Sequence, residues 1–315
     1  MRFFLGLLLL GACGDSSGPP DAAEDAAPDA PPLDDSCLEA GNTLAIEGGV
    51  TDLAIDEGVL YVGSPTALRV LDLELTVERE VAVEAEQVLA TDGRVAVRSG
   101  GEVRLLGDDL EVVGRVNASV RSTAAIREAR LFVFRHPESA RINTFEITNI
   151  AELTTPEVLG GLDVGGTVPG SMAVDNERAY AVDSSSPSDV QILVIDVANS
   201  AAPTLLQSLR MGGLTPASDV SVREGMLYVG TTDGVRIFQT TDFAEVGLHG
   251  GGPVVAVSNR RIATAGETLR VLRGGCASLE PAAELARTAT SLAWSGSTLV
   301  VGTTEGVETF RWVCR

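Results

Sequence analysis

The stretch Gly225-Met-Leu-Tyr-Val-Gly-Thr-Thr-Asp-Gly-Val-Arg-Ile-Phe238 decides how this chain folds. It begins with a short apolar run that is rich in strand-forming residues, continues through a Thr-Thr-Asp-Gly turn signal, and ends in a second apolar run. This order predicts one strand, a tight turn and a second strand. Similar segments occur elsewhere in the chain, so the stretch is one unit of an internal repeat.

Seven segments align on the strand that precedes the turn. They are Val59–Gly63, Arg94–Arg98, Arg130–Phe134, Arg178–Val182, Met226–Gly230, Arg261–Ala265 and Thr298–Gly302. Their second residues are separated by 35, 36, 48, 48, 35 and 37 positions. A period in this range, with strands alone, is typical of the blades of a β-propeller. We therefore predict an all-β, seven-bladed propeller over residues 37–315.

Closure of the ring is predicted at the two ends of this repeat. Each unit has four predicted strands except the last, which lacks the fourth. The stretch that opens with Cys37-Leu-Glu resembles the one that opens with Cys276-Ala-Ser-Leu-Glu in blade six. We therefore expect residues 38–48 to pair with the outer edge of blade seven. This pairing would remove the two free strand edges that an open array leaves.

The N-terminal residues predict export and lipidation. Arg2 precedes an apolar run from Phe3 to Ala12, which has the length of a signal-peptide core and is too short to span a bilayer. Residues 10–13, Leu-Gly-Ala-Cys, resemble the bacterial lipobox, in which the cysteine becomes the lipidated first residue. We expect residues 1–12 to be a signal peptide and Cys13 to anchor the protein in the cell envelope. The alternative is an ordinary secretory signal with a chance cysteine.

Residues 13–36 are predicted to be a disordered, acidic tether. They are Pro, Ala, Asp, Ser and Gly almost throughout, and such a composition cannot bury enough apolar surface to fold. Gly14 stands where some lipoproteins carry an Asp that retains them at the inner membrane, and its presence there favours the outer membrane.

The net charge of -21 argues against nucleic acid and anionic lipid as partners. All 23 basic residues are arginine, which we attribute to codon usage.

Three cysteines remain once Cys13 is assigned to the lipid. In the blade alignment Cys276 and Cys314 each fall three residues after an arginine. Cys37 opens the strand that would follow Cys314 in an uninterrupted blade. Because an exported compartment permits disulfides, we predict a Cys37–Cys314 bond, with Cys37–Cys276 as the alternative.

Blades three and four carry a further pattern. Residues 144–159 and 191–206 each contain an apolar strand, an Asn or Asp turn residue, a proline and a second apolar run. These segments resemble the LVIVD repeat. The resemblance implies a β-propeller on bacterial envelope proteins, similar to lipoproteins of myxobacteria-like organisms. It implies no catalytic residues.

A candidate binding site is predicted where blades three and four are longer than the others. Part of the extra length falls between their second and third strands, and neighbouring blades place such loops side by side. We predict a polar patch there that binds a ligand or partner. Its members are Arg135, His136, Glu138, Arg141, Asp183, Ser185 and Asp189. The alternative is that these residues are tolerated surface insertions.

The motifs of the chain point away from catalysis. His136 and His249 are far apart and have no partner at metal-ligand spacing. The sequence contains no phosphate-binding loop and no nucleophile elbow. We therefore predict no metal, no cofactor and no catalytic residue. The expected function is a membrane-tethered propeller that binds a protein or saccharide partner in the envelope. The alternatives are a quinoprotein-like or lactonase-like enzyme at the channel mouth, for which the inner strands offer few carboxylates, and a structural scaffold.

Overall fold

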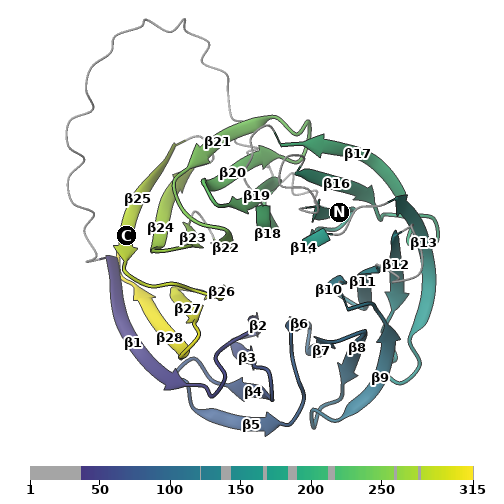
Figure 1. The fold of residues 1–315 in the computed structure, drawn as a ribbon, viewed down its shortest axis with the longest axis horizontal. Helices are drawn as coiled ribbons and strands as arrows, with labels where there is room; N and C mark the ends of the chain where they lie inside the picture. Colours follow the sequence, from purple (N-terminus) through teal and green to yellow (C-terminus); the bar gives the residue numbers. More distant parts are fainter. Residues whose placement is uncertain are drawn as a thin grey trace, which may run out of the picture. The chain divides into compact units, whose positions relative to one another are not determined.

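The computed structural model describes residues 37–120, 122–135, 143–165, 169–183, 190–211, 217–258, 261–275 and 278–314. Within these ranges every regular element is a strand, and the strands form seven four-stranded antiparallel sheets arranged in a ring (Figure 1). No helix in the described part of the chain is long and apolar enough to cross a membrane. The predicted all-β, seven-bladed propeller is confirmed. The predictions for residues 1–36, including Cys13, lie outside the described residues.

The blades follow one another along the chain, and each runs from an innermost to an outermost strand (Figure 1). Blade one holds β2 (Asp52–Asp56), β3 (Val59–Gly63), β4 (Leu68–Leu71) and β5 (Val77–Val81). Blade two holds β6 (Gln87–Thr91), β7 (Arg94–Ser99), β8 (Glu102–Leu106) and β9 (Val112–Asn117). Blade three holds β10 (Thr123–Arg127), β11 (Arg130–Arg135), β12 (Asn143–Asn149) and β13 (Glu157–Gly165).

The other four blades repeat this plan. Blade four holds β14 (Pro169–Val174), β15 (Arg178–Asp183), β16 (Gln191–Asp196) and β17 (Thr204–Arg210). Blade five holds β18 (Ala217–Arg223), β19 (Met226–Thr231), β20 (Gly234–Gln239) and β21 (Glu245–His249). Blade six holds β22 (Val254–Ser258), β23 (Arg261–Ala265), β24 (Leu269–Gly275) and β25 (Ser278–Leu285). Blade seven holds β26 (Ser291–Ser295), β27 (Thr298–Gly302), β28 (Gly306–Trp312) and, from the N-terminal side, β1 (Leu38–Ala45).

Strand β1 closes the ring as predicted. It pairs antiparallel with β28, with Leu38 opposite Trp312 at one end and Ala45 opposite Gly306 at the other. Just beyond this pair, Cys37 and Cys314 form a disulfide with their Cα atoms 4.9 Å apart. The predicted pairing of Cys37 with Cys314 is thus present in the structure. Cys276, the alternative partner, lies outside the described residues.

The core is divided among the interfaces between blades. Seven hydrophobic clusters lie in the structure, one between each pair of neighbouring sheets. The cluster between blades three and four contains Phe132, Phe134 and Phe145. The ring centroid of Phe145 lies 6.2 Å from that of Phe132 and 5.5 Å from that of Phe134. Because each blade buries both of its faces, its inner strands are apolar almost throughout. The same burial in every blade explains why the inner strands of successive repeat units have similar apolar sequences.

Two features of the repeated hairpin follow from its glycines. At the turn between β18 and β19, Glu224 and Gly225 have φ angles of 51° and 76°, the left-handed conformation that a two-residue hairpin turn requires. The glycine that ends the second strand has a different role. A Cβ on Gly63 would lie 2.7 Å from Val88 of the next blade, and one on Gly230 would lie 2.3 Å from the carbonyl oxygen of Pro253. Glycine there lets consecutive blades approach closely.

Candidate functional site

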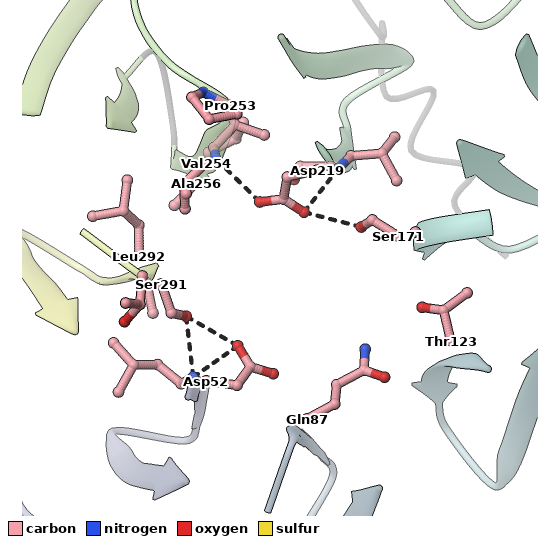
Figure 2. Close-up of a pocket in the computed structure, with 18 of the residues that line it drawn as sticks. Asp52, Gln87, Thr123, Ser171, Asp219, Pro253, Val254, Ala256, Ser291 and Leu292 are labelled. Carbon is pink, nitrogen blue, oxygen red and sulfur yellow. Dashed lines mark hydrogen bonds between the residues drawn. The ribbon is translucent and has the colours of Figure 1, made fainter. Parts of the chain in front are cut away.

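A ring of seven residues, one from each blade, surrounds a cavity at the centre of the propeller. In each blade the ring residue lies on the innermost strand, at an equivalent register opposite the second strand and at or within two residues of the start of their pairing. The ring consists of Asp52, Gln87, Thr123, Ser171, Asp219, Val254 and Ser291, and all seven line a cavity of about 530 Å³. Figure 2 shows the labelled polar side chains gathered around this space. We call the side of the propeller that carries the connections between blades the crossover face, and the ring lies toward it.

Asp52 ties three blades together at this ring. Its Oδ2 accepts a hydrogen bond from the backbone N–H of Val88 in blade two at 2.9 Å. Its Oδ1 accepts from the N–H of Leu53 at 2.8 Å and from the hydroxyl of Ser291 in blade seven at 3.0 Å (Figure 2). The carboxyl of Asp52 is therefore a clamp between blades.

Asp219 repeats the same arrangement elsewhere in the ring. Its Oδ2 accepts from the N–H of Val255 in blade six at 3.0 Å. Its Oδ1 accepts from the N–H of Val220 at 2.8 Å and from the hydroxyl of Ser171 in blade four at 3.0 Å (Figure 2). In both clamps the aspartate stands opposite a glycine at or next to the end of the second strand, Gly63 or Gly230. The close approach allowed by that glycine brings the next blade within reach of the carboxylate.

Gln87 makes a neutral clamp at the equivalent position of blade two. Its Oε1 accepts from the N–H of Ala124 in blade three at 3.1 Å, and its Nε2 donates to the carbonyl oxygen of Ala124 at 2.9 Å. An amide therefore joins two blades as a carboxylate does, without introducing charge.

Both ring carboxylates have a raised pKa. Burial is the largest cause for Asp52 and raises its pKa from 3.8 to about 6, although hydrogen bonds from Val88, Leu53 and Ser291 act in the opposite direction. The negative charge of Asp219 adds to the increase. Burial also raises the pKa of Asp219, against three hydrogen bonds that lower it. The cavity thus holds two carboxyl groups for which the charged state is costly.

Three other side chains shape the cavity wall. Arg98 and Glu86 form an ion pair at its rim. Ser122 is only 7% exposed, and its hydroxyl has no hydrogen-bond partner among the described residues. Trp294 also lines the cavity, and the guanidinium of Arg261 lies 4.7 Å from the centre of its ring.

The two ring carboxylates are held in place by the clamps they form. Each aspartate already accepts three hydrogen bonds, two from backbone N–H groups and one from a serine hydroxyl. The described residues contain no group of three or more His, Cys, Asp or Glu side chains that could hold a metal ion. A lactonase-like site would need several inward carboxylates around a divalent ion, and the described strands supply two, each engaged in a clamp.

Two members of the predicted patch lie within the described residues. Arg135 ends β11, where its guanidinium forms an ion pair with Glu146. Asp183 ends β15 and is only 3% exposed, so its own side chain offers little surface to a partner, and the predicted patch as a whole stays a prediction. Its position at the inner end of a second strand, paired with Pro169 and Gln191, accounts for the burial. The members that lie outside the described residues are His136, Glu138, Arg141, Ser185 and Asp189.

The ring of clamps was missed at the level of sequence. The repeated first strands Asp52–Asp56 and Asp219–Arg223 both open with aspartate, and neither aspartate was among the predicted site residues. A usable signal was present, because each aspartate precedes an apolar strand whose partner ends in glycine. That coincidence of Asp and Gly in the same blade marks the two charged clamps.

Comparison with known proteins supports the fold. No protein-family model matches the chain, and no curated protein matches its sequence. Among solved structures, it is similar to hydrazine synthase of Kuenenia stuttgartiensis, with a TM-score of 0.69 and 12% identity over 86% of this chain and 98% of that chain. The WD40 domain of Neurospora crassa Pan2 gives a TM-score of 0.69 and 10% identity over 90% and 98% of the two chains. The WD40 propeller domain of Doa1 gives 0.67 and 11% identity over 88% and 97%.

At these identities the likeness shows the fold alone. The resemblance of blades three and four to the LVIVD repeat stays a prediction.

Proposed function

We propose that this chain is a membrane-tethered, non-catalytic propeller that binds a protein or saccharide partner in the bacterial cell envelope, with its lipid anchor at Cys13 in the outer membrane. The observation that carries the proposal is where two neighbouring second strands end, β11 at Arg135 and β15 at Asp183. The third strands of these blades begin only at Asn143 and Gln191, whereas residues 232–233 alone separate β19 from β20 in blade five. Sequence that follows the strand ends of a rigid scaffold is where propellers, like other scaffolds, can carry recognition residues.

The packing beneath these strand ends supports a fixed platform. Blades three and four share the aromatic cluster of Phe132, Phe134 and Phe145, each at most 1% exposed. The second strands that lead to the long connections, β11 and β15, are therefore anchored in a tightly packed interface. Residues displayed from a rigid scaffold lose less conformational entropy on binding than residues of a loose one.

The absence of lysine gives a selective way to find the partner. A carbodiimide couples carboxylates to amines, and the only amine this chain has is at its N-terminus. Coupling on intact cells should therefore join aspartate and glutamate residues of this chain to lysines of a protein partner, with little reaction within the chain. Mass spectrometry of the products identifies that partner. A saccharide partner would instead give retention of the purified chain on envelope polysaccharide, with no coupled protein.

A variant pair ties the partner to the predicted patch. His136→Ala combined with Arg141→Ala should abolish the coupled product or the retention. Arg94→Ala, which removes one positive charge on the opposite side of blade two, should leave either result unchanged. If the patch variant and the control capture the same partner equally well, the patch is not the binding site.

Tethering is tested separately. Cys13→Ala should release the chain from the membrane fraction, and the unmodified protein should carry the mass of its acyl chains at the mature N-terminus. An unmodified protein that is exported in soluble form without lipid would contradict the anchor and leave the partner-binding experiment intact.

A further inference from the structure

A second cavity lies on the side opposite the crossover face, where the turns between first and second strands are. It has a volume of about 650 Å³ and is lined by residues of blades three, four and five. Three arginines line it, namely Arg127 at the end of β10, Arg178 at the start of β15 and Arg223 at the end of β18. Three consecutive blades therefore each contribute one arginine to the same cavity.

Two of these arginines reach across the junction to the next blade. The guanidinium of Arg127 donates to the side-chain oxygen of Asn176, in the turn that precedes Arg178. The guanidinium of Arg178 donates in turn to the carbonyl oxygen of Thr240 in blade five. It also lies 5.7 Å from the ring centre of Phe243. Both side chains are thus held in fixed positions by contacts with the following blade.

Thr240 continues the connection to the third arginine. Its N–H and its hydroxyl both donate to the carbonyl oxygen of Gly225, at 2.8 Å and 3.0 Å. Gly225 belongs to the turn that follows Arg223 at the end of β18. A continuous series of hydrogen bonds therefore runs from Arg127 past Arg178 to the turn beside Arg223, and the three arginines line one connected surface.

Two of the three arginines have no carboxylate partner. Arg130 begins β11 as Arg178 begins β15, and it pairs with Glu128 at 3.6 Å. Among the described residues, neither Arg127 nor Arg178 forms an ion pair. Both lie in partly buried surroundings. Because a partly buried charge without an opposite charge is costly, a negative group of a bound molecule would stabilise these two side chains.

Both guanidinium groups also keep hydrogen-bond donors for such a molecule. A guanidinium has five N–H donors in one rigid plane, four of them on its terminal nitrogens. Arg127 uses two terminal donors on blade four, and Arg178 bonds to Thr240 and to the hydroxyl of Tyr180. Each arginine therefore keeps terminal N–H groups, and paired N–H groups of this kind match the two oxygens of a carboxylate.

From the shared cavity, the connected arginines and their unpaired charge, we infer that this cavity binds a small organic carboxylate. Asp175, Glu177 and Glu224 line it too. The carboxylate of Asp175 is occupied, because it accepts the N–H groups of Glu177 and Arg178 at 2.9 Å and 2.8 Å and the hydroxyl of Tyr180 at 2.9 Å. Glu177 and Glu224 are exposed, so water and salt screen their charge. These acids still repel a doubly charged phosphate more than a singly charged carboxylate.

The test follows the arginine side chains by NMR, with the full chain and sodium acetate as the probe. All 23 basic residues are arginine, so labelling arginine with nitrogen-15 gives a small set of side-chain Nε–H signals. Arg127→Lys and Arg178→Lys assign the two signals of interest. The Nε of Arg127 is buried, which protects its hydrogen from exchange with water. Acetate should shift both signals saturably, and equal concentrations of sodium chloride should not.

Variants connect the shifts to the proposed residues. Arg127→Gln and Arg178→Gln should each weaken acetate binding at least about tenfold, measured on the signal of the other arginine, because each removes a nearby opposite charge. Arg178→Lys keeps the charge without the planar pair of donors and should weaken binding several-fold. Arg94→Gln is the matched control. Arg94 begins β7 as Arg178 begins β15, but it does not line this cavity, so its variant should bind acetate normally.

Circular dichroism shows which variants are folded, and the titration of the unmodified chain tests the cavity without any variant. The inference is overturned if acetate shifts neither signal saturably, if chloride gives the same shifts, or if the folded arginine variants bind as the unmodified chain does. Saturation by sodium phosphate at lower concentrations than acetate would overturn the assignment to a carboxylate. None of these outcomes bears on the envelope partner proposed above, since that experiment uses other residues and another readout.

Discussion

The clamps of Asp52 and Asp219 have the same chemistry and different places in the chain. Each takes one hydroxyl from the preceding blade, one N–H from its own strand and one N–H from the following blade. The Asp219 clamp joins blades four, five and six, and its serine is 48 residues away. The Asp52 clamp joins blades seven, one and two, and its serine is 239 residues away.

The difference shows that a hydrogen bond has consequences beyond its own geometry. When the bond of Asp219 forms, nearby parts of the chain are already connected through blade four. The bond between Asp52 and Ser291 instead spans the junction where the two ends of the repeat array meet. Closing a long loop costs more conformational entropy than closing a short one. The Asp52 clamp, together with β1 and the disulfide, therefore has a share in ring closure that the Asp219 clamp lacks.

The largest effect is expected from the disulfide at this junction. Cys314→Ser should lower the free energy of unfolding by about 4 kcal/mol or less, because the bond restrains an unfolded loop of 277 residues. Urea unfolding of the variant and of the unmodified chain measures the difference. In the variant, β1 should exchange its amide hydrogens faster while blades four to six keep their protection. Equal loss of protection in all blades would mean that the ring opens as one unit.

Removal of each clamp should have the next largest effect. Asp52→Ala and Asp219→Ala should each cost about 2–3 kcal/mol, because partly buried donors lose their acceptor. Combined with Cys314→Ser, Asp52→Ala should show a coupling of about 0.5 kcal/mol or more, and Asp219→Ala should be additive. Denaturant unfolding of the three single and two double variants, beside the unmodified chain, measures this. Equal coupling for the two aspartates would remove the distinction between them.

The pH dependence of stability should separate the effect of the negative charge of Asp52 from the effect of its hydrogen bonds. Its pKa of about 6 in the folded chain lies above the ordinary 3.8, so the folded state holds the proton more tightly than the unfolded state. The contribution of protonation to stability is therefore full below about pH 4 and is lost as the pH rises through 6. The difference in melting temperature between the unmodified chain and Asp52→Asn should shift across this window. A difference that is independent of pH would show that Asp52 titrates normally.

The smallest effect separates the two serines. Ser291 donates to Asp52 at 3.0 Å and also accepts the N–H of Leu53 at 3.1 Å, whereas Ser171 donates to Asp219. Ser291→Ala should therefore cost about 1–1.5 kcal/mol, and Ser171→Ala about 0.5–1 kcal/mol. Precise unfolding midpoints at fixed pH measure the difference. A larger cost for Ser171→Ala than for Ser291→Ala would show that the extra hydrogen bond of Ser291 adds no net stability.

The propeller could be predicted from the sequence because its signals are local and repeated. Apolar second strands, turn residues and a period of 35–48 positions are visible without knowing any contact between blades. Closure by β1 and the Cys37–Cys314 bond followed from the same alignment. The repeat therefore carried the information for the architecture and for the way its ends meet.

The site could not be predicted in the same way, because it consists of contacts between blades. Asp52 is a strand-opening residue in the sequence, and its partners Val88 and Ser291 become neighbours only when the ring is closed. The burial of Asp183 could not be foreseen for the same reason. It is 3% exposed at the end of β15, and the sequence gives the length of the stretch that follows but not the packing of the strand end.

The disulfide at the closure also means that the order of the blades along the chain could be changed without changing the ring. Because Cys37 and Cys314 lie with Cα atoms 4.9 Å apart, residues 37–314 form a single covalent circle. A short peptide linker could replace the bond, and new termini could be opened at the turn of any other blade. Such circular permutants should fold to the same ring, because all seven interfaces between neighbouring blades would be kept.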